Sequence, residues 1–431
     1  MNRRQLPFSF LDYSHSDLTD PEHDLLSYFT QIRDENIQPI FDNLYSGRGP
    51  KGFGLNLFLA QILKIKENFL SDRALESKLL SNSIYRFCCG FDRKQDVPHF
   101  SSFSKMRKRL GAQGYIDIHT KFVNQAHEIG FIDSTIPGLP RHRKTGVVLI
   151  ADSTFLYAHC SKSALRKLNS DFVRDEKGRL VFKDSSARIG RPHHTYKFPL
   201  GHRAQTLHTV NGVPLVSLVV EANRGDEEFI FDLLEGLSIR HPQINFAYII
   251  LDKGYDEAPI HQRIYYDYGI IPVIIRKNNI RYPKGFLQDG TPLCESGIGL
   301  IRRGTDYHRE RTKYICNQQC KKKTKPQKEL FTCPYVTSTN SNGLVIYTYF
   351  NKNMRLYGPA TPNSRIYQKL KPLRIGIERD YALLKANRYR MQATLNYEGF
   401  ESVLQHVILF DIVLVQDKIF EHLNKNKTKK P

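Results

Sequence analysis

The chain has 431 residues, more than one compact core usually holds, so its length predicts two or three domains. Its 64 lysine and arginine residues exceed its 43 aspartate and glutamate residues by 21, and this surplus indicates a polyanionic partner. Its apolar stretches are far shorter than the roughly 20 residues of a membrane span, and no apolar signal segment follows residues 1–5. Its seven cysteines, without an export signal, are typical of a reducing cytosol. We therefore expect a cytoplasmic protein without membrane contact.

The N-terminal third of the chain is expected to be helical after a polar arm. Residues 1–50 end in a basic loop rich in glycine and proline, which we interpret as an arm and linker. In residues 51–144, apolar side chains recur every three or four positions, which predicts short helices. The expected helices cover residues 55–66, residues 71–79 and residues 101–110, where Gly111 ends the last one. Basic residues surround this last helix, so we interpret residues 51–144 as a small all-α DNA-binding domain.

Near residue 145 the pattern changes from helical to extended, and we place the start of a second domain, residues 145–420, there. A β-branched apolar run at residues 147–151 predicts a buried strand. Asn211-Gly212, between apolar runs, predicts a hairpin with a type I′ turn. The further expected elements are a helix that begins at Asp226, a strand at residues 246–251, a helix at residues 257–267 and a strand at residues 270–275. This order predicts an α/β domain with a mixed sheet and helices on its faces.

Residues 277–365 break this rhythm, and we interpret them as an insertion in which only residues 343–350 predict a strand. Four cysteines within about forty residues form a possible structural zinc site, with His308 as a reserve ligand. These cysteines are Cys294, Cys316, Cys320 and Cys333. The pattern lacks the Cys-x2-Cys pairs of typical zinc sites, so metal-free cysteines are the alternative. Helices are expected again at residues 372–386 and 400–420, before a basic tail at residues 421–431.

Two aspartates directly follow predicted strands. Asp152 comes after residues 147–151, and Asp252 comes after residues 246–251. The carboxyl ends of strands are where the site residues of α/β sheets collect. For either residue alone, the capping of the next turn is the simpler explanation. The pair is more informative than one residue.

A third carboxylate lies in the helix expected at residues 372–386. Glu378 stands four residues after Arg374 and seven before Lys385, and 100° per residue puts the three side chains on one helix face. Alone, this pattern would indicate a solvated face with ion pairs. Together with two strand-end aspartates, however, a third carboxylate can complete a site for two Mg²⁺ ions that act on a phosphodiester.

These residues resemble the acidic triad of DDE transposases of bacterial insertion sequences. The spacing Arg374-(x3)-Glu378-(x6)-Lys385 matches three residues of the tyrosine-arginine-glutamate-lysine signature of one large group of them. Other segments also resemble blocks of this family. They are residues 70–76, 85–87 and 98–103 in the helical region, and residues 151–154, 184–190, 196–198 and 251–256 around the two aspartates.

The resemblance implies a fold and a set of site residues. The fold is an RNase H-like mixed sheet with an insertion, preceded by a small all-α DNA-binding domain. The implied catalytic and magnesium-binding residues are Asp152, Asp252 and Glu378, with Mn²⁺ able to replace Mg²⁺. The implied DNA-phosphate ligands are Arg374, Lys385 and Lys371. Lys371 stands where the signature has its tyrosine, and the nearest upstream tyrosine is Tyr367.

The resemblance also implies a function. We expect a transposase that binds the terminal inverted repeats of its insertion sequence and catalyses metal-dependent DNA strand cleavage and strand transfer. Its partners would be double-stranded transposon ends, target DNA and a second copy of the chain, in the nucleoid of a bacterial cytoplasm. Two alternatives remain open, namely an RNase H-like nuclease that cleaves without joining and an inactive DNA-binding remnant.

Overall fold

The computed structural model describes residues 19–44, 53–132, 146–160, 165–168, 171–176, 178, 180–191, 198–316, 335, 343–382, 384–385 and 388–427. The chain divides into two units. Unit 1 comprises Met1–Asp133, Ser153–Pro242 and Ile377–Pro431, and unit 2 comprises Ser134–Asp152 and Gln243–Gly376. The chain therefore passes between the units more than once, and both units are discontinuous in sequence.

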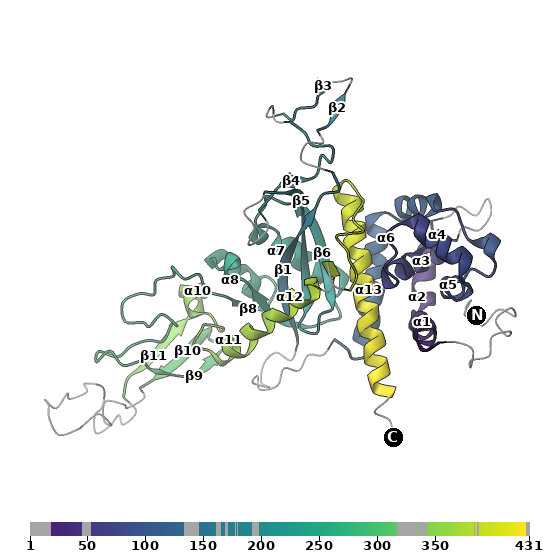
Figure 1. Ribbon diagram of the computed structural model, residues 1–431. Coiled ribbons are helices and arrows are strands. Elements are labelled where there is room, and N and C mark those ends of the chain that lie inside the picture. The colour runs from purple at the N-terminus through teal and green to yellow at the C-terminus, as the bar shows by residue number, and fades with distance from the viewer. Residues whose placement is uncertain are drawn as a thin grey trace. The chain divides into compact units, whose positions relative to one another are not determined.

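The N-terminal part of unit 1 consists of helices joined by turns and short loops in the residues that the structure describes (Figure 1). Its helices are α1 (Asp20–Thr30), α2 (Asp34–Asp42), α3 (Gly54–Lys66), α4 (Asp72–Ser81), α5 (Ser83–Cys89) and α6 (Ser101–Glu128), with a 3₁₀ turn, η3, at Lys94–Asp96. The helices expected at residues 55–66 and 71–79 are confirmed as α3 and α4. Ser71 caps α4, because its hydroxyl accepts a hydrogen bond of 3.1 Å from the backbone nitrogen of Ala74.

The expected helix end at Gly111 corresponds to a break within α6. Gly111 has a φ of +63° and breaks the helical geometry, but the chain re-enters the helix and α6 continues to Glu128. Buried residues of the second half, such as Ile118 and Phe122, keep the helical spacing after the kink. The glycine therefore ends the first helical segment, as predicted, and the second segment, which reaches Glu128, was not predicted.

The longest C-terminal helix, α13 (Phe400–Lys427), packs against α6 and β6 within unit 1. The sequence predicted this helix but ended it at residue 420. Buried apolar residues line α13, including Val403, Val407, Phe410 and Val415. Asp417 is also buried, and Lys66 and Arg388 reach its carboxylate at 2.9 and 3.2 Å. The long apolar face of α13 therefore forms part of the core of unit 1.

Unit 1 also holds the antiparallel part of a sheet. Strand β5 (Leu200–Thr209) pairs antiparallel with β4 (Arg188–Ile189) and with β6 (Pro214–Glu221). The predicted hairpin is confirmed, but its type I′ turn is wrong, because that turn needs two consecutive positive φ values and only Gly212 has one, at +79°. The Gly212 nitrogen donates to the Thr209 carbonyl at 2.9 Å, as in longer loops that a left-handed glycine closes.

The helix expected from Asp226 begins there as a 3₁₀ turn, η4 (Asp226–Phe229), and continues as α7 (Ile230–Arg240). A small two-stranded ribbon, β2 (Lys167–Leu168) with β3 (Asp171–Phe172), precedes β4. Its residues are exposed.

Unit 2 holds the parallel part of the sheet. Strand β1 (Val147–Tyr157) begins in unit 2, where it pairs in parallel with β7 (Phe246–Leu251), and β7 pairs in parallel with β8 (Ile271–Ile274). A 3₁₀ turn, η5 (Lys253–Tyr255), and helix α8 (Ala258–Tyr266) connect β7 to β8. The strand order is β4-β5-β1-β7-β8, with β6 on β5. This mixed sheet confirms the predicted α/β class and is consistent with an RNase H-like core.

The predicted insertion contains a second, three-stranded antiparallel sheet. Its order is β11 (Val345–Tyr349), β10 (Arg311–Ile315) and β9 (Ile301–Asp306). The sequence predicted only β11. The helical elements after it are η6 (Phe350–Lys352), α10 (Met354–Tyr357), α11 (Arg365–Leu370), η7 (Lys371–Arg374) and α12 (Ile375–Ala382). The single helix expected at residues 372–386 is therefore wrong in extent, because a 3₁₀ turn occupies its start and α12 ends at Ala382.

Candidate active site

The pairing of β1 with β7 brings Asp152 and Asp252 close together. The register pairs Ile150 with Ile250 in parallel strands. If this register continues for two residues, Asp152 lies opposite Asp252. Asp252 thus leaves the carboxyl end of β7, as predicted. The expected strand end before Asp152 is wrong, because β1 continues to Tyr157, and Asp152 instead follows the part of β1 that pairs with β7.

One arginine connects the two carboxylates. Nη2 of Arg374 lies 3.3 Å from Oδ2 of Asp152 and 3.7 Å from Oδ2 of Asp252. The side chains of Asp152 and Asp252 keep 18% and 33% of their surface exposed, and that of Arg374 keeps 20%. Two negative groups and one positive group therefore share a site that stays open to solvent.

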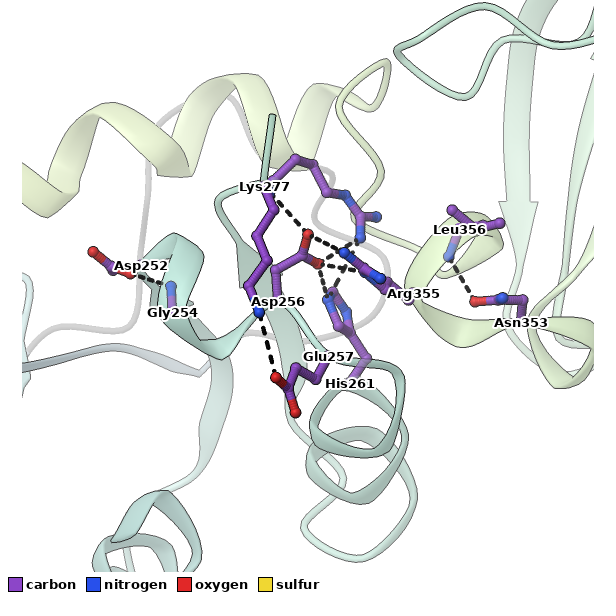
Figure 2. Close-up of polar contacts among 10 residues, drawn as sticks. Asp252, Gly254, Asp256, Glu257, His261, Lys277, Asn353, Arg355 and Leu356 are labelled. Atoms are coloured by element: carbon purple, nitrogen blue, oxygen red, sulfur yellow. Dashed lines mark hydrogen bonds and ion pairs between the residues drawn. The ribbon is translucent and has the colours of Figure 1, made fainter. Parts of the chain in front are cut away.

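The backbone after β7 also holds Asp252. Its Oδ1 accepts a hydrogen bond from the backbone nitrogen of Gly254, and this contact starts η5 (Figure 2). A Cβ on residue 254 would stand 3.3 Å from the same oxygen, so glycine lets the chain turn close to the carboxylate. The backbone nitrogen of Gly254 thus holds Oδ1 of Asp252, and Oδ2 lies on the side of Arg374.

Helix α11 and the turn η7 determine the positions of Lys371 and Arg374. Helix α11 is anchored by buried Leu370, and η7, which carries both basic residues, contacts β7. Lys371 is exposed, and its Nζ lies 5.8 Å from the ring centroid of Tyr367. Tyr367 itself is buried, and burial raises the pKa of its hydroxyl. The tyrosine nearest to the signature position is therefore a core residue, while Lys371 offers its charge to solvent.

Glu378 and Lys385 belong to unit 1. Glu378 is exposed in the first turn of α12. Lys385 lies beyond the end of α12 and donates a hydrogen bond of 2.7 Å from Nζ to the carbonyl oxygen of Phe155 on β1, also in unit 1. Burial lowers the pKa of the Lys385 ammonium. The expected common helix face of Arg374, Glu378 and Lys385 does not exist as one regular helix, and the roles of these residues stay predictions.

A second aspartate on the segment after β7 is buried and surrounded by cations (Figure 2). Asp256 accepts hydrogen bonds from His261 on α8, from Arg276 and the Lys277 backbone after β8, and from Arg355 on α10. The Arg355 contact is bidentate, at 3.1 Å from Nε to Oδ1 and 3.0 Å from Nη2 to Oδ2. These contacts tie the turn after Asp252 to three other elements of unit 2.

The charges around Asp256 determine its protonation. Burial alone would raise the pKa of this carboxyl group, but hydrogen bonds from its neighbours and the charge of Arg276 together hold it well below its ordinary value. Burial lowers the pKa of His261 to about 4, although its hydrogen bond with Asp256 acts in the opposite direction. At neutral pH the cluster therefore holds an ionised aspartate and a neutral histidine.

The sequence did not predict a further carboxylate that contacts the segment around Asp152. In unit 1, Asp226 accepts a hydrogen bond of 2.8 Å from the hydroxyl of Ser153, the residue after Asp152. Asp226 also forms an ion pair of 2.7 Å with Arg203. The sequence pattern predicted only that a helix begins at Asp226. Nothing in its spacing pointed to Ser153, because 73 residues separate the two.

Two of the four cysteines of the predicted zinc site, Cys320 and Cys333, lie outside the described residues. Cys294 and Cys316 are half-buried. In the described part of the chain, no group of three or more histidine, cysteine, aspartate or glutamate side chains is arranged to hold a metal ion. The structural zinc site therefore stays a prediction.

The oxygen ligands at the sheet edge fit a hard divalent cation in their chemistry. Asp152 and Asp252 offer carboxylate oxygens, which Mg²⁺ prefers, and their partial exposure leaves these oxygens accessible. Asp256 does not fit, because four donors already occupy it. Asp152 and Asp252 are therefore the pair suited to a metal in unit 2.

Comparison with known families gives two matches. Residues 128–414, more than half of the chain, match the family described as Transposase DDE domain. Residues 14–109 match the family described as Transposase domain (DUF772). A search of curated proteins finds no match to the chain. Among the helices that the structure describes, none has both the length and the apolar character that a membrane span requires.

Proposed function

Because the chain belongs to the Transposase DDE domain family, we propose that it binds the terminal inverted repeats of its own insertion sequence and catalyses DNA strand cleavage and strand transfer. One observation carries this proposal. Asp152, within β1, and Asp252, directly after the neighbouring parallel strand β7, lie within 3.3 and 3.7 Å of the same guanidinium nitrogen.

In this proposal Asp152, Asp252 and Glu378 hold Mg²⁺, as two ions that Mn²⁺ can replace. When bound, the ions activate the attacking oxygen and stabilise the charge on the leaving oxygen. The partial exposure of Asp152 and Asp252 supports their part, and the exposed position of Glu378 on α12 is compatible with its part.

The basic residues near the triad have their own proposed role. Arg374 neutralises the two aspartates in the metal-free chain, so a bound cation would release its guanidinium to pair with a phosphate of the transposon end. Lys371 is exposed and close in sequence, and Lys385 would act as a third phosphate ligand. The partly buried ammonium of Lys385 makes its contribution the weakest of the three.

We further propose that the helical N-terminal region binds double-stranded DNA. Exposed basic side chains on α6 support this role, namely Lys105, Lys108 and Arg109. Affinity would come largely from phosphate neutralisation, so it should fall steeply as salt rises. Joining two transposon ends to a target requires two active sites, which favours a homodimer on DNA in the bacterial nucleoid.

The test uses purified full-length protein, Mg²⁺ and a labelled duplex with the sequence that flanks its gene. Wild type should cleave at a defined end and join the product to a target duplex. Asp252→Asn and Glu378→Gln should lower the cleavage rate by at least about a thousandfold and leave DNA binding intact. Asp267→Asn is the matched control, because Asp267 is an exposed carboxylate of unit 2 that pairs only with Arg263 in the described structure.

Each other outcome has a distinct meaning. Cleavage without joining would support an RNase H-like nuclease. Binding without cleavage, by wild type and variants alike, would contradict the enzymatic proposal and leave a DNA-binding remnant. A DNA affinity that does not change with salt would contradict the proposed mode of binding.

A further inference from the structure

Unit 2 contains a cavity of about 740 Å³ that is separate from the residues at the sheet edge. Its volume lies within the range of about 300 to 1,000 Å³ that is typical of ligand pockets. Strand β9, the start of α11 and Tyr248 on β7 line it. The side chains that matter for its chemistry are Tyr248, Arg302, Arg303, Tyr307, Arg365 and Gln368.

The charge of this cavity is one-sided. Three of its lining residues are arginines, and none of the described residues that line it is an aspartate or a glutamate. Arg303 and Arg365 are exposed, and neither forms an ion pair with any residue that the structure describes. Two positive charges therefore line this space without a carboxylate partner among the described residues.

Arg302 adds a third positive charge to the wall of this cavity. Its guanidinium is half-buried and makes five hydrogen bonds, all to neutral oxygens. The acceptors are the side chains of Thr361, Asn363, Thr305 and Thr312 and the carbonyl of Pro359. Burial lowers the pKa of Arg302, and the neighbouring Tyr314 and Tyr307 offset this effect only in part. A partly desolvated arginine without a carboxylate favours the approach of an external anion.

We infer that this cavity, which we call the arginine pocket, binds a phosphate group carried by a nucleotide. Arginine suits this ligand because its planar fork donates two hydrogen bonds to phosphate oxygens. The phosphate can belong to a DNA strand or to a free nucleotide. This inference rests on the proposed function only for the DNA source.

Continuity with the sheet edge favours the DNA source. Tyr248 lines the arginine pocket, and Asp252 follows four residues later along the direction of β7, about 13 Å away at the rise of a strand. Helix α11, which carries Arg365, leads directly into η7 and Arg374. A DNA strand that reaches Asp252 can therefore extend a few nucleotides to the arginine pocket.

The test compares full-length wild type with the double variant Arg303→Gln, Arg365→Gln. Arg302 stays unchanged, because its hydrogen bonds connect β9 to residues 359–363 and its loss would disturb folding. Arg263→Gln is the matched control, since Arg263 is an arginine of unit 2, 52% exposed, that pairs with Asp267. Thermal unfolding of each variant verifies that it is folded.

Binding of a fluorescent duplex is measured between 50 and 200 mM salt, and binding of deoxyadenosine monophosphate is measured by calorimetry. We expect the double variant to bind the duplex about tenfold more weakly and with a salt slope lower by about 2. Arg263→Gln should match wild type. Loss of mononucleotide binding alone would assign the pocket to a free nucleotide.

If the double variant binds both probes as wild type does, the arginine pocket is not a phosphate site. The variant Asp252→Asn separates this result from the proposed function. It should bind both probes normally and fail only in cleavage. Absence of cleavage in wild type, together with an arginine-dependent phosphate site, would overturn the function and keep the pocket.

Discussion

Asp252 and Asp256 are the same residue type, four positions apart on one segment of unit 2, yet their surroundings are opposite. Asp252 keeps 33% of its side chain exposed and has a single arginine near Oδ2, at 3.7 Å. Asp256 is fully buried, and two arginines, a histidine and a backbone nitrogen satisfy its oxygens. The difference teaches that an aspartate with full internal partners stabilises the fold, whereas one with few partners remains available to a ligand.

The largest effect on stability should come from a substitution of the buried aspartate, Asp256. Asp256→Asn removes the charge that compensates Arg276 and Arg355, and we expect a loss of about 3 kcal/mol in the free energy of unfolding. Urea denaturation monitored by circular dichroism measures it. The control is Glu257→Gln, an exposed carboxylate 3.3 Å from Lys277, which should change stability by no more than about 0.5 kcal/mol. Equal effects of the two variants would contradict the structural role of Asp256.

A third aspartate sharpens the comparison, because it is buried without a cation. Asp411 on α13 accepts a hydrogen bond of 2.6 Å from the Ser217 hydroxyl, and burial raises its pKa to about 7. An unfolded aspartate titrates near 3.9, so between about pH 4 and 7 the folded state binds a proton that the unfolded state lacks. Stability from this group is therefore present at low pH and falls as pH rises to 7.

The variant Asp411→Asn isolates this contribution. We expect wild type to lose about 2 kcal/mol relative to the variant between pH 5 and pH 7, as measured by urea denaturation at both values. His119 and His208, whose pKa values burial lowers to about 3, change stability in the opposite direction in both proteins and cancel in the difference. A difference that does not depend on pH would show that Asp411 is ionised throughout this range.

The smallest effect on stability should come from the exposed side of the comparison. Asp252→Asn removes only a partly exposed contact with Arg374, so the free energy of unfolding should change by less than about 1 kcal/mol. The same urea titration measures it. A loss as large as that of Asp256→Asn would mean that Asp252 has a structural role like that of its neighbour.

The parts of the fold that the sequence predicted are those with local signals. The strand at residues 246–251 was predicted with the bounds of β7, because an apolar run bounded by polar residues leaves few alternatives. The proximity of Asp152 and Asp252 was predicted by placing both after strands, although β1 continues past Asp152 and only Asp252 follows its strand. The interpretation of residues 1–50 as an arm and linker is wrong for the part that holds α1 and α2, and the spacing of Leu25, Tyr28 and Phe29 carries a helical signal for α1.

Other features depend on contacts that no local pattern contains. Strands β9 and β10 have largely exposed or half-buried residues and many basic side chains, so they looked like a loop. The partners of Asp256 include Arg355, 99 residues later, which only tertiary structure brings close. The arginine pocket likewise combines residues of β7, β9 and α11. The metal-binding and DNA-binding roles of the predicted site residues remain predictions.

The cluster around Asp256 has one more consequence, for the tolerance of the chain to change. Arg276 and Lys277 stand where the predicted insertion begins, and Arg355 stands near its end, so one aspartate fastens both ends of the intervening segment. Once the ends of a segment are fastened, doubling its length costs only about 0.6 kcal/mol of closure entropy. The connections between the strands of this segment can therefore gain length during evolution or engineering while the turn that orients Asp252 keeps its anchors.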